Sequence, residues 1–166
     1  MRKDIDHILY DEATIAAKVR EIGARITKDY EGKAPFLVGV LKGCFVFMSD
    51  LSKEIDLYCD IDFMAVSSYG SGTTTTGAVQ IKKDLSRNIE GRDVIIIEDI
   101  LDSGVTLSYL TKYLENRKPA SIKICTLMDK PARRKTDIKA DYIGFECPDE
   151  FVVGYGLDYD EKYRNL

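Results

Sequence analysis

Apolar residues recur every three or four positions in the segment that follows Asp11. A helix places such positions on one face, where they can pack against a core. Asp is a residue type that favours the N-cap of a helix, and Gly32 is of the type that ends one. The pattern therefore predicts a helix from about residue 12 to residue 30. Its apolar positions are Ile15, Val19, Ile22, Ile26 and Tyr30.

Short continuous apolar runs alternate with helical segments along the rest of the chain. The clearest run, at 94–97, consists of Val and Ile, whose β-branched side chains favour strands. Such alternation predicts an α/β fold in which helices cover both faces of a mostly parallel sheet. With no repeat and no linker in sight, we expect one domain over residues 1–166. Further strands are predicted at 36–41, 60–67, 121–128, 142–145 and 152–155, and further helices at 45–51 and 106–116.

Residues 67–77 consist almost entirely of Ser, Thr and Gly. Such a segment has little to bury, so packing cannot fix its position. Two interpretations are equally compatible with this composition: a flexible hairpin loop, or a lid over an active site.

The charge balance disfavours binding to nucleic acid. The 166 residues include 24 Lys and Arg against 28 Asp and Glu, for a net charge of −4. Nucleic-acid binders usually present a basic face. The short basic cluster Arg133-Arg134-Lys135 is expected to be a solvated turn.

The cysteines and the chain termini indicate a cytoplasmic, soluble protein. Cys44, Cys59, Cys125 and Cys147 form no C-x-x-C pair, so we expect small buried thiols in a reducing compartment. The N-terminus carries acidic residues where a signal peptide needs an apolar run. No apolar stretch approaches the ~20 residues that span a bilayer.

The most informative segment is EDILDSGVT, residues 98–106. Two carboxylates, Glu98 and Asp99, follow the predicted buried strand, at the edge where open parallel sheets bind ligands. A short loop of small residues then leads into a predicted helix. The free N–H groups at the start of a helix suit a phosphate group, and Gly104 allows a close approach.

Simpler interpretations explain single residues of this segment. Asp102 or Ser103 could only cap the helix, and Glu98 and Asp99 could face solvent at the end of a strand. A phosphate-loop NTPase is excluded because no G-x-x-x-x-G-K-[ST] motif occurs, and G-x-G-x-x-G is absent too. None of these alternatives explains why acids, loop and helix adjoin.

Residues 98–106 resemble the phosphoribosyl-pyrophosphate motif of the type I phosphoribosyltransferases. Further stretches are similar to the hypoxanthine(-guanine) members: VLKG at 40–43, Ser68-Tyr69, DKP at 129–131 and ECPDEFVVGYGLD at 146–158. The resemblance runs in order from about residue 37 to residue 166. It implies a Rossmann-like central sheet flanked by helices, with a small hood formed by the N- and C-terminal segments.

The resemblance also implies a role for each residue of the motif. Asp102 matches the general acid/base near purine N7. Glu98 and Asp99 match the pair that holds the ribose hydroxyls and Mg²⁺. The cradle of the 5′-phosphate corresponds to Ser103, Gly104, Val105 and Thr106.

Residues outside the motif acquire roles in the same way. Lys42-Gly43 matches the pyrophosphate loop, which contains a non-proline cis peptide in this family, and Ser68 and Tyr69 match pyrophosphate contacts in the lid. Lys130 matches the donor to the 6-oxo group of the base. The remaining implied contacts are Phe151 stacking on the purine, Val152 at its edge, Asp158 at a second magnesium position, and Arg164 on pyrophosphate.

The implied reaction is the magnesium-dependent transfer of a 5-phosphoribosyl group from phosphoribosyl pyrophosphate to N9 of hypoxanthine or guanine. The products are IMP or GMP and pyrophosphate, as in purine salvage. Relatives of this kind are usually homodimers or homotetramers. Xanthine or adenine as the acceptor, and a nucleotide-sensing regulator that binds RNA or DNA, are the alternatives; the regulator is disfavoured by the net charge of −4.

Overall fold

Six strands form one mixed sheet in the computed structural model, which describes residues 1–68 and 79–166. Their order across the sheet is β3-β2-β1-β4-β5-β6, and every neighbouring pair is parallel except β2 and β3. The strands are β1 (Phe36–Leu41), β2 (Asp60–Ser68), β3 (Val79–Lys83), β4 (Asp93–Leu101), β5 (Ser121–Asp129) and β6 (Tyr142–Glu146). The helices are α1 (Glu12–Asp29), α2 (Phe45–Glu54) and α3 (Val105–Glu115), with 3-10 turns η1 (Arg2–Asp4) and η2 (Pro131–Arg133).

The predicted α/β fold is therefore confirmed, with two differences in its strands. The prediction omitted β3, because VQIKK carries few apolar residues and only pairs along the edge of β2. The strand predicted at 152–155 is wrong: this region contains only an isolated bridge between Gly154 and Leu157.

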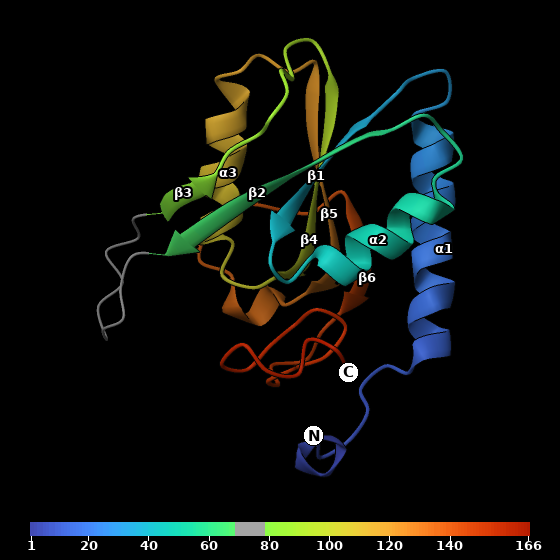
Figure 1. Cartoon of the computed structure of the whole chain (residues 1–166), viewed down its shortest axis with the longest axis vertical. Helices are drawn as coiled ribbons and strands as arrows, with labels where there is room; N and C mark the ends of the chain where they lie inside the picture. Colours follow the sequence, from blue (N-terminus) through green and yellow to red (C-terminus); the bar gives the residue numbers. More distant parts are fainter. Residues whose placement is uncertain (69–78) are drawn as a thin grey trace.

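Helices cover the two faces of the sheet separately. Apolar residues of α1 and α2 pack with Leu37, Ile95 and Ile97 on one face. Residues of α3 pack with Val38 and Ile96 on the other. Figure 1 shows α1 and α3 on opposite sides of the strands. The alternation of neighbouring β1 and β4 residues between two cores explains why β1 and residues 94–97 of β4 are continuously apolar.

The sequence determines where α1 begins. The Asp11 carboxylate accepts a hydrogen bond from the Thr14 amide at 2.8 Å, as expected of an N-cap. The helix ends at Asp29, and Gly32 follows with a φ of +74°. The predicted cap and the apolar stripe are both confirmed.

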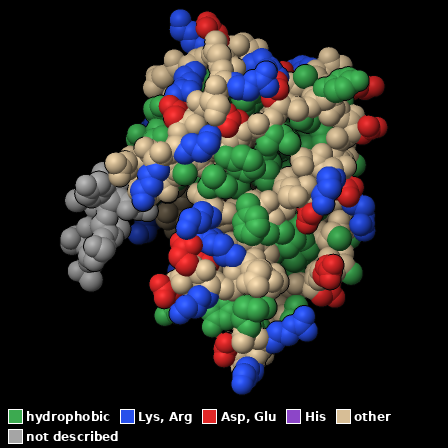
Figure 2. All heavy atoms as spheres, viewed as in Figure 1, with side chains coloured by type: hydrophobic (Ala, Val, Ile, Leu, Met, Phe, Trp, Pro, Cys, Tyr) green, Lys and Arg blue, Asp and Glu red, His purple; other side chains and the backbone are tan. Residues whose placement is uncertain are grey.

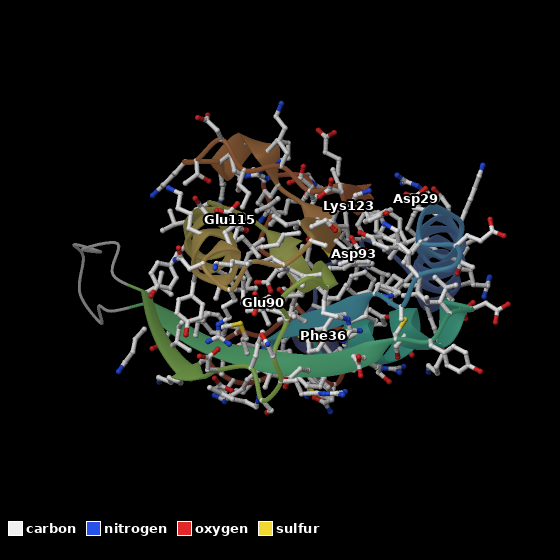
Figure 3. All side chains as sticks on the ribbon, turned by 90° about the horizontal axis from the view of Figure 1, so that it is seen from above. Asp29, Phe36, Glu90, Asp93, Glu115 and Lys123 are labelled. Atoms are coloured by element: carbon white, nitrogen blue, oxygen red, sulfur yellow. The ribbon has the colours of Figure 1, made fainter. Side chains whose placement is uncertain are left out.

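The two ends of the chain meet near the carboxyl ends of the parallel strands. Tyr10 donates a hydrogen bond to the Glu146 carbonyl, and Tyr163 donates one to Asp4. In Figure 1 the C-terminal segment, in red, lies below the sheet, close to the N-terminus. Phe36, Asp93 and Lys123, labelled in Figure 3, mark the opposite edge, where β1, β4 and β5 begin.

Two surface properties complete the description. On the face that Figure 2 shows, Lys and Arg side chains are interspersed with Asp and Glu. Among the described residues, no helix is both long enough and apolar enough to cross a membrane.

Candidate active site

Glu98 and Asp99 lie within β4 rather than after it. The prediction that the strand ends before these residues is wrong: β4 pairs with β5 as far as Leu101. The Asp99 side chain is buried, and one of its oxygens accepts a hydrogen bond from the Ile100 amide at 2.7 Å. Glu98 Oε2 is buried without a hydrogen-bond partner among the described residues.

Burial makes it costly to ionise these two carboxyl groups. It raises the pKa of Glu98 well above its ordinary value, and the neighbouring charge of Asp99 adds to this shift. Burial also raises the pKa of Asp99 to about 6. Hydrogen bonds from backbone amides and the charge of Arg164 lower this pKa but only partly offset the effect of burial. A cation or a set of hydroxyl groups would stabilise both carboxylates.

The loop after β4 leads into the first turn of α3. Gly104 is the N-cap residue, with a φ of +78°, and no side chain of the described residues caps the helix. The alternative that Asp102 or Ser103 serves as the cap is therefore wrong. Ser103 Oγ accepts only a long contact from the Val105 amide, at 3.4 Å. First-turn amides have no acceptor within their own helix, so this loop can bind an anion.

Asp102 directly precedes these amides in the chain. Its Oδ1 atom is buried and has no hydrogen-bond partner in the described part of the chain. A buried oxygen without a partner is costly to the free protein. It is therefore a position where a ligand donor would be favourable.

The Lys42-Gly43 loop follows β1 and lies against β4. A non-proline cis peptide joins Leu41 to Lys42, one bond before the Lys42-Gly43 bond. A Cβ atom on Gly43 would be 1.6 Å from Asp99 Oδ2, and one on Gly156 would be 2.0 Å from the Gly43 carbonyl oxygen. The absence of side chains at these two glycines lets the loop, β4 and the C-terminal segment meet.

Ion pairs order the C-terminal segment, and the Lys42–Glu161 pair joins it to this loop. Arg164 binds Asp158 at 2.8 Å and donates to the Gly156 carbonyl at 2.7 Å. Glu161 accepts a hydrogen bond from Lys42 at 2.9 Å, which lowers the pKa of Glu161. Arg164 is therefore fixed despite its place near the end of the chain. Glu161 was missed because neither its spacing nor a motif distinguishes it from other surface acids.

The three carboxylates proposed as magnesium ligands do not form a preformed cluster. Within residues 1–68 and 79–166, no group of three or more His, Cys, Asp or Glu side chains is arranged to hold a metal ion. Asp158 is instead occupied by Arg164 and by the Glu161 amide, at 2.8 Å from each. Of the three, Glu98 keeps the unpartnered buried oxygen.

Lys130 and Phe151 flank the same edge of the sheet. Lys130 is 4% exposed, and its ammonium group donates to the Glu150 carbonyl at 2.6 Å. Phe151 is 73% exposed and meets the ring of Tyr159 edge-on, with centroids 5.7 Å apart. Val152, the next residue, is half-buried. An exposed aromatic ring beside a buried ammonium group offers a flat ligand both a stacking surface and a hydrogen-bond donor.

Two predicted site residues lie at the boundary of the described structure. Ser68 is the last residue of β2. Tyr69 and most of the predicted lid at 67–77 lie outside the described residues.

The basic cluster at 133–135 contains the other residue that sequence reasoning missed. Arg133 pairs with Asp149 on the surface, as a solvated turn would allow. Arg134 is not solvated: its side chain is only 15% exposed and forms an ion pair with Asp129. It also donates to the Leu101 and Asp102 carbonyls, behind the loop at 102–106, a contact that composition cannot reveal.

Comparisons with known proteins agree with this geometry. Residues 7–160 match the model of the phosphoribosyl transferase domain. The chain is 58% identical to the hypoxanthine-guanine phosphoribosyltransferase of Bacillus subtilis and 56% identical to that of Streptococcus thermophilus, with 100% of this chain and 92% of each relative covered. It superimposes on the crystal structure of a hypoxanthine phosphoribosyltransferase from Staphylococcus aureus with a TM-score of 0.97. The sequence identity is 57%, with 100% of this chain and 90% of the other covered.

Proposed function

Because the chain belongs to the phosphoribosyltransferase family, we propose that it transfers the 5-phosphoribosyl group of phosphoribosyl pyrophosphate to N9 of hypoxanthine or guanine. The products are IMP or GMP and pyrophosphate, and the role of the enzyme is purine salvage. The observation that carries this proposal is the unpartnered Asp102 oxygen next to the uncapped start of α3.

The loop at 102–106 binds the 5′-phosphate in this proposal. Amides of Ser103, Gly104, Val105 and Thr106 donate to the phosphate oxygens, and the Ser103 and Thr106 hydroxyls add further donors. The positive end of the α3 dipole favours the same anion. The carboxylates of Glu98 and Asp99 accept hydrogen bonds from the ribose hydroxyls.

Lys130 and Phe151 select the base. The ammonium group has three donors and no acceptor, so it favours the 6-oxo group of hypoxanthine or guanine over the 6-amino group of adenine. Since one donor already binds the Glu150 carbonyl, others remain for the base. Phe151 stacks on the purine, and the Val152 backbone contacts its edge.

Lys42 and Arg164 bind the pyrophosphate, together with the Gly43 backbone, Ser68 and Tyr69. Lys42 is held by Glu161, and Arg164 by Asp158. The incoming anion competes with these two carboxylates for the cations. The lid at 67–77 excludes water from C1′ when substrate is bound.

The donor set at the edge of β4 fits Mg²⁺. Glu98 and Asp99 offer only carboxylate oxygens, which hard cations prefer, and Glu98 Oε2 has no other partner in the described chain. We assign these two residues to the metal, joined by Asp158 once Arg164 turns to pyrophosphate. Magnesium, when bound, neutralises negative charge on the pyrophosphate.

Asp102 moves the proton of the reaction. As the bond from C1′ to pyrophosphate breaks, positive charge develops on the ribose and N9 attacks C1′. The neutral purine must then lose a proton, and the Asp102 carboxylate accepts this proton from N7. Lys42 stabilises the negative charge that develops on the departing pyrophosphate.

An absorbance assay tests the proposal. The protein is incubated with phosphoribosyl pyrophosphate, Mg²⁺ and hypoxanthine, guanine, xanthine or adenine in separate reactions. We expect nucleotide from hypoxanthine or guanine, and none when a chelator removes the metal. Absence of product with every base would overturn the proposal.

Two further properties belong to this proposal. The four cysteines are free thiols, which fits a protein of the reducing cytoplasm. We further propose that the protein forms a homodimer or homotetramer, as relatives of this kind usually do. Light scattering coupled to size exclusion would measure the assembly; a monomer at micromolar concentration would contradict it.

A further inference from the structure

Arg134 binds the back of the phosphate loop. Its Nε donates to the Asp102 carbonyl at 3.0 Å, and one terminal nitrogen donates to the Leu101 carbonyl at 3.2 Å. The other terminal nitrogen donates to the Ile138 carbonyl at 2.7 Å. The guanidinium also forms an ion pair with Asp129 at the end of β5. Arg134 thus joins the backbone at residues 101–102 and at residue 138 to the side chain of Asp129.

Other groups of the same segment complete this support. The Lys135 amide donates to the Ser103 carbonyl at 2.9 Å, and the Lys130 amide donates to the Leu101 carbonyl at 3.0 Å. Gly104 packs so closely here that a Cβ atom would be 2.5 Å from Thr136 Oγ1. Three consecutive carbonyls, at 101, 102 and 103, are therefore bound by residues 130–135.

This arrangement determines where the amides of the loop point. In a trans peptide the C=O and the following N–H point in opposite directions. Carbonyls held toward residues 130–135 therefore turn the N–H groups of Asp102, Ser103 and Gly104 away from that segment. The face that they reach is the one we assign to phosphate.

We propose that Arg134 is a positioning residue for the phosphate site, acting through the backbone of residues 101–103 without touching the substrate. The inference rests on the proposed function for its ligand, but its structural content does not depend on the reaction. Only a planar, forked side chain can donate to three carbonyls and a carboxylate at once. A lysine keeps the charge but has a single nitrogen, so it cannot hold the carbonyls of residues 101, 102 and 138 together.

The test compares Arg134→Lys with a matched control, Arg92→Lys. Arg92 also binds one carboxylate and one carbonyl, those of Asp60 and Ala34, but it lies at the start of β4, at the opposite edge of the sheet. We expect Arg134→Lys to raise the KM for phosphoribosyl pyrophosphate about 10-fold, as the loss of one or two hydrogen bonds would. The KM for hypoxanthine should change much less, and Arg92→Lys should leave both KM values as in the wild type.

Hydrogen exchange supplies a readout that does not require turnover. In the free protein, amides of residues 101–106 should exchange faster in Arg134→Lys than in the wild type or in Arg92→Lys. Asp129→Asn leaves Arg134 in place but neutralises its partner. In this variant the same amides should also exchange faster than in the wild type, but by less than in Arg134→Lys.

The outcomes separate this inference from the proposed function. If the wild-type protein has no transferase activity but the variants show the predicted exchange pattern, the proposed reaction is wrong and the positioning role of Arg134 stands. Wild-type exchange at residues 101–106 in both Arg134→Lys and Asp129→Asn would overturn the inference. An equal rise of both KM values in Arg134→Lys would overturn it too, because a general structural defect has no preference for the phosphate-bearing substrate.

Discussion

The Asp99 carboxylate lies against Gly43 so closely that a Cβ atom at residue 43 would be 1.6 Å from Asp99 Oδ2. This contact joins the loop after β1 to the carboxyl end of β4, on which the ribose and metal contacts are proposed. The two segments therefore cannot move independently.

Gly43→Ala should displace either the loop or Asp99. Overpacking of this kind costs about 1–3 kcal/mol of stability, and we expect kcat/KM for phosphoribosyl pyrophosphate to fall at least ~10-fold. The control is Gly32→Ala, where the added Cβ would meet no atom of the described residues within 4 Å and only the φ of +74° is unfavourable. Thermal unfolding should detect a lower stability in both variants. Steady-state kinetics should detect a lower kcat/KM only in Gly43→Ala. Full activity of Gly43→Ala would show that the contact is dispensable.

Asp102→Asn should lower kcat by about 10²–10⁴-fold, because an amide cannot accept the purine proton. The fold should persist, since Asn has nearly the same shape and needs no buried charge. Initial rates with hypoxanthine measure the effect, and exposed Asp137→Asn is the control. Wild-type turnover of Asp102→Asn would assign the proton transfer to another group.

The sequence predicted most of the helices and strands because their signals are local. The N-cap at Asp11, the apolar stripe of α1 and the β-branched run in β4 each depend on neighbouring residues only. The edge strand β3 and the irregular segment at 152–155 depend on partners outside the segment instead. Residues 79–83 become a strand through pairing with β2, and the amides of Tyr155 and Gly156 donate to the Leu166 and Arg164 carbonyls near the end of the chain.

Lys130→Met should raise the KM for hypoxanthine by about 10-fold or more, because a charge-assisted hydrogen bond to the 6-oxo group is lost. Met fills most of the same buried volume. The KM for phosphoribosyl pyrophosphate should change little, and initial rates with each substrate varied in turn would measure both. Unchanged hypoxanthine kinetics would remove Lys130 from base recognition.

Asp62 should make stability depend on pH in the acid range. Burial alone would raise the pKa of this carboxyl, but hydrogen bonds from the Ser86 and Phe63 amides and from Lys83 outweigh it and hold the pKa below its usual range. A carboxyl with a depressed pKa in the folded state stabilises the protein above the unfolded-state pKa of about 3.9, and this contribution is lost as the pH falls through the folded-state value.

Urea unfolding from pH 7 to pH 3 would measure this effect. Asp62→Asn should be less stable than the wild type at pH 7, and the difference should shrink toward pH 3. Exposed Asp137→Asn provides the comparison. A difference between Asp62→Asn and the wild type that is the same at pH 7 and pH 3 would contradict the prediction.

The site residues, like the helices and strands, divide into those with a local sequence signal and those without one. The motif at 98–106 is contiguous, so its resemblance to a known family identifies the phosphate loop. Arg134 and Glu161 act through atoms far away in the sequence, on the carbonyls of residues 101 and 102 and on Lys42. A surface Arg or Glu with no recognisable spacing carries no such information until the fold places its partners beside it.

A crystal structure of the protein with IMP would test the proposed binding site most directly. We predict the 5′-phosphate on the amides of residues 103–106, the 6-oxo group on Lys130 and the purine ring against Phe151. A nucleotide bound elsewhere, or a loop at 102–106 whose amides are turned toward the protein, would contradict the assignment of this site.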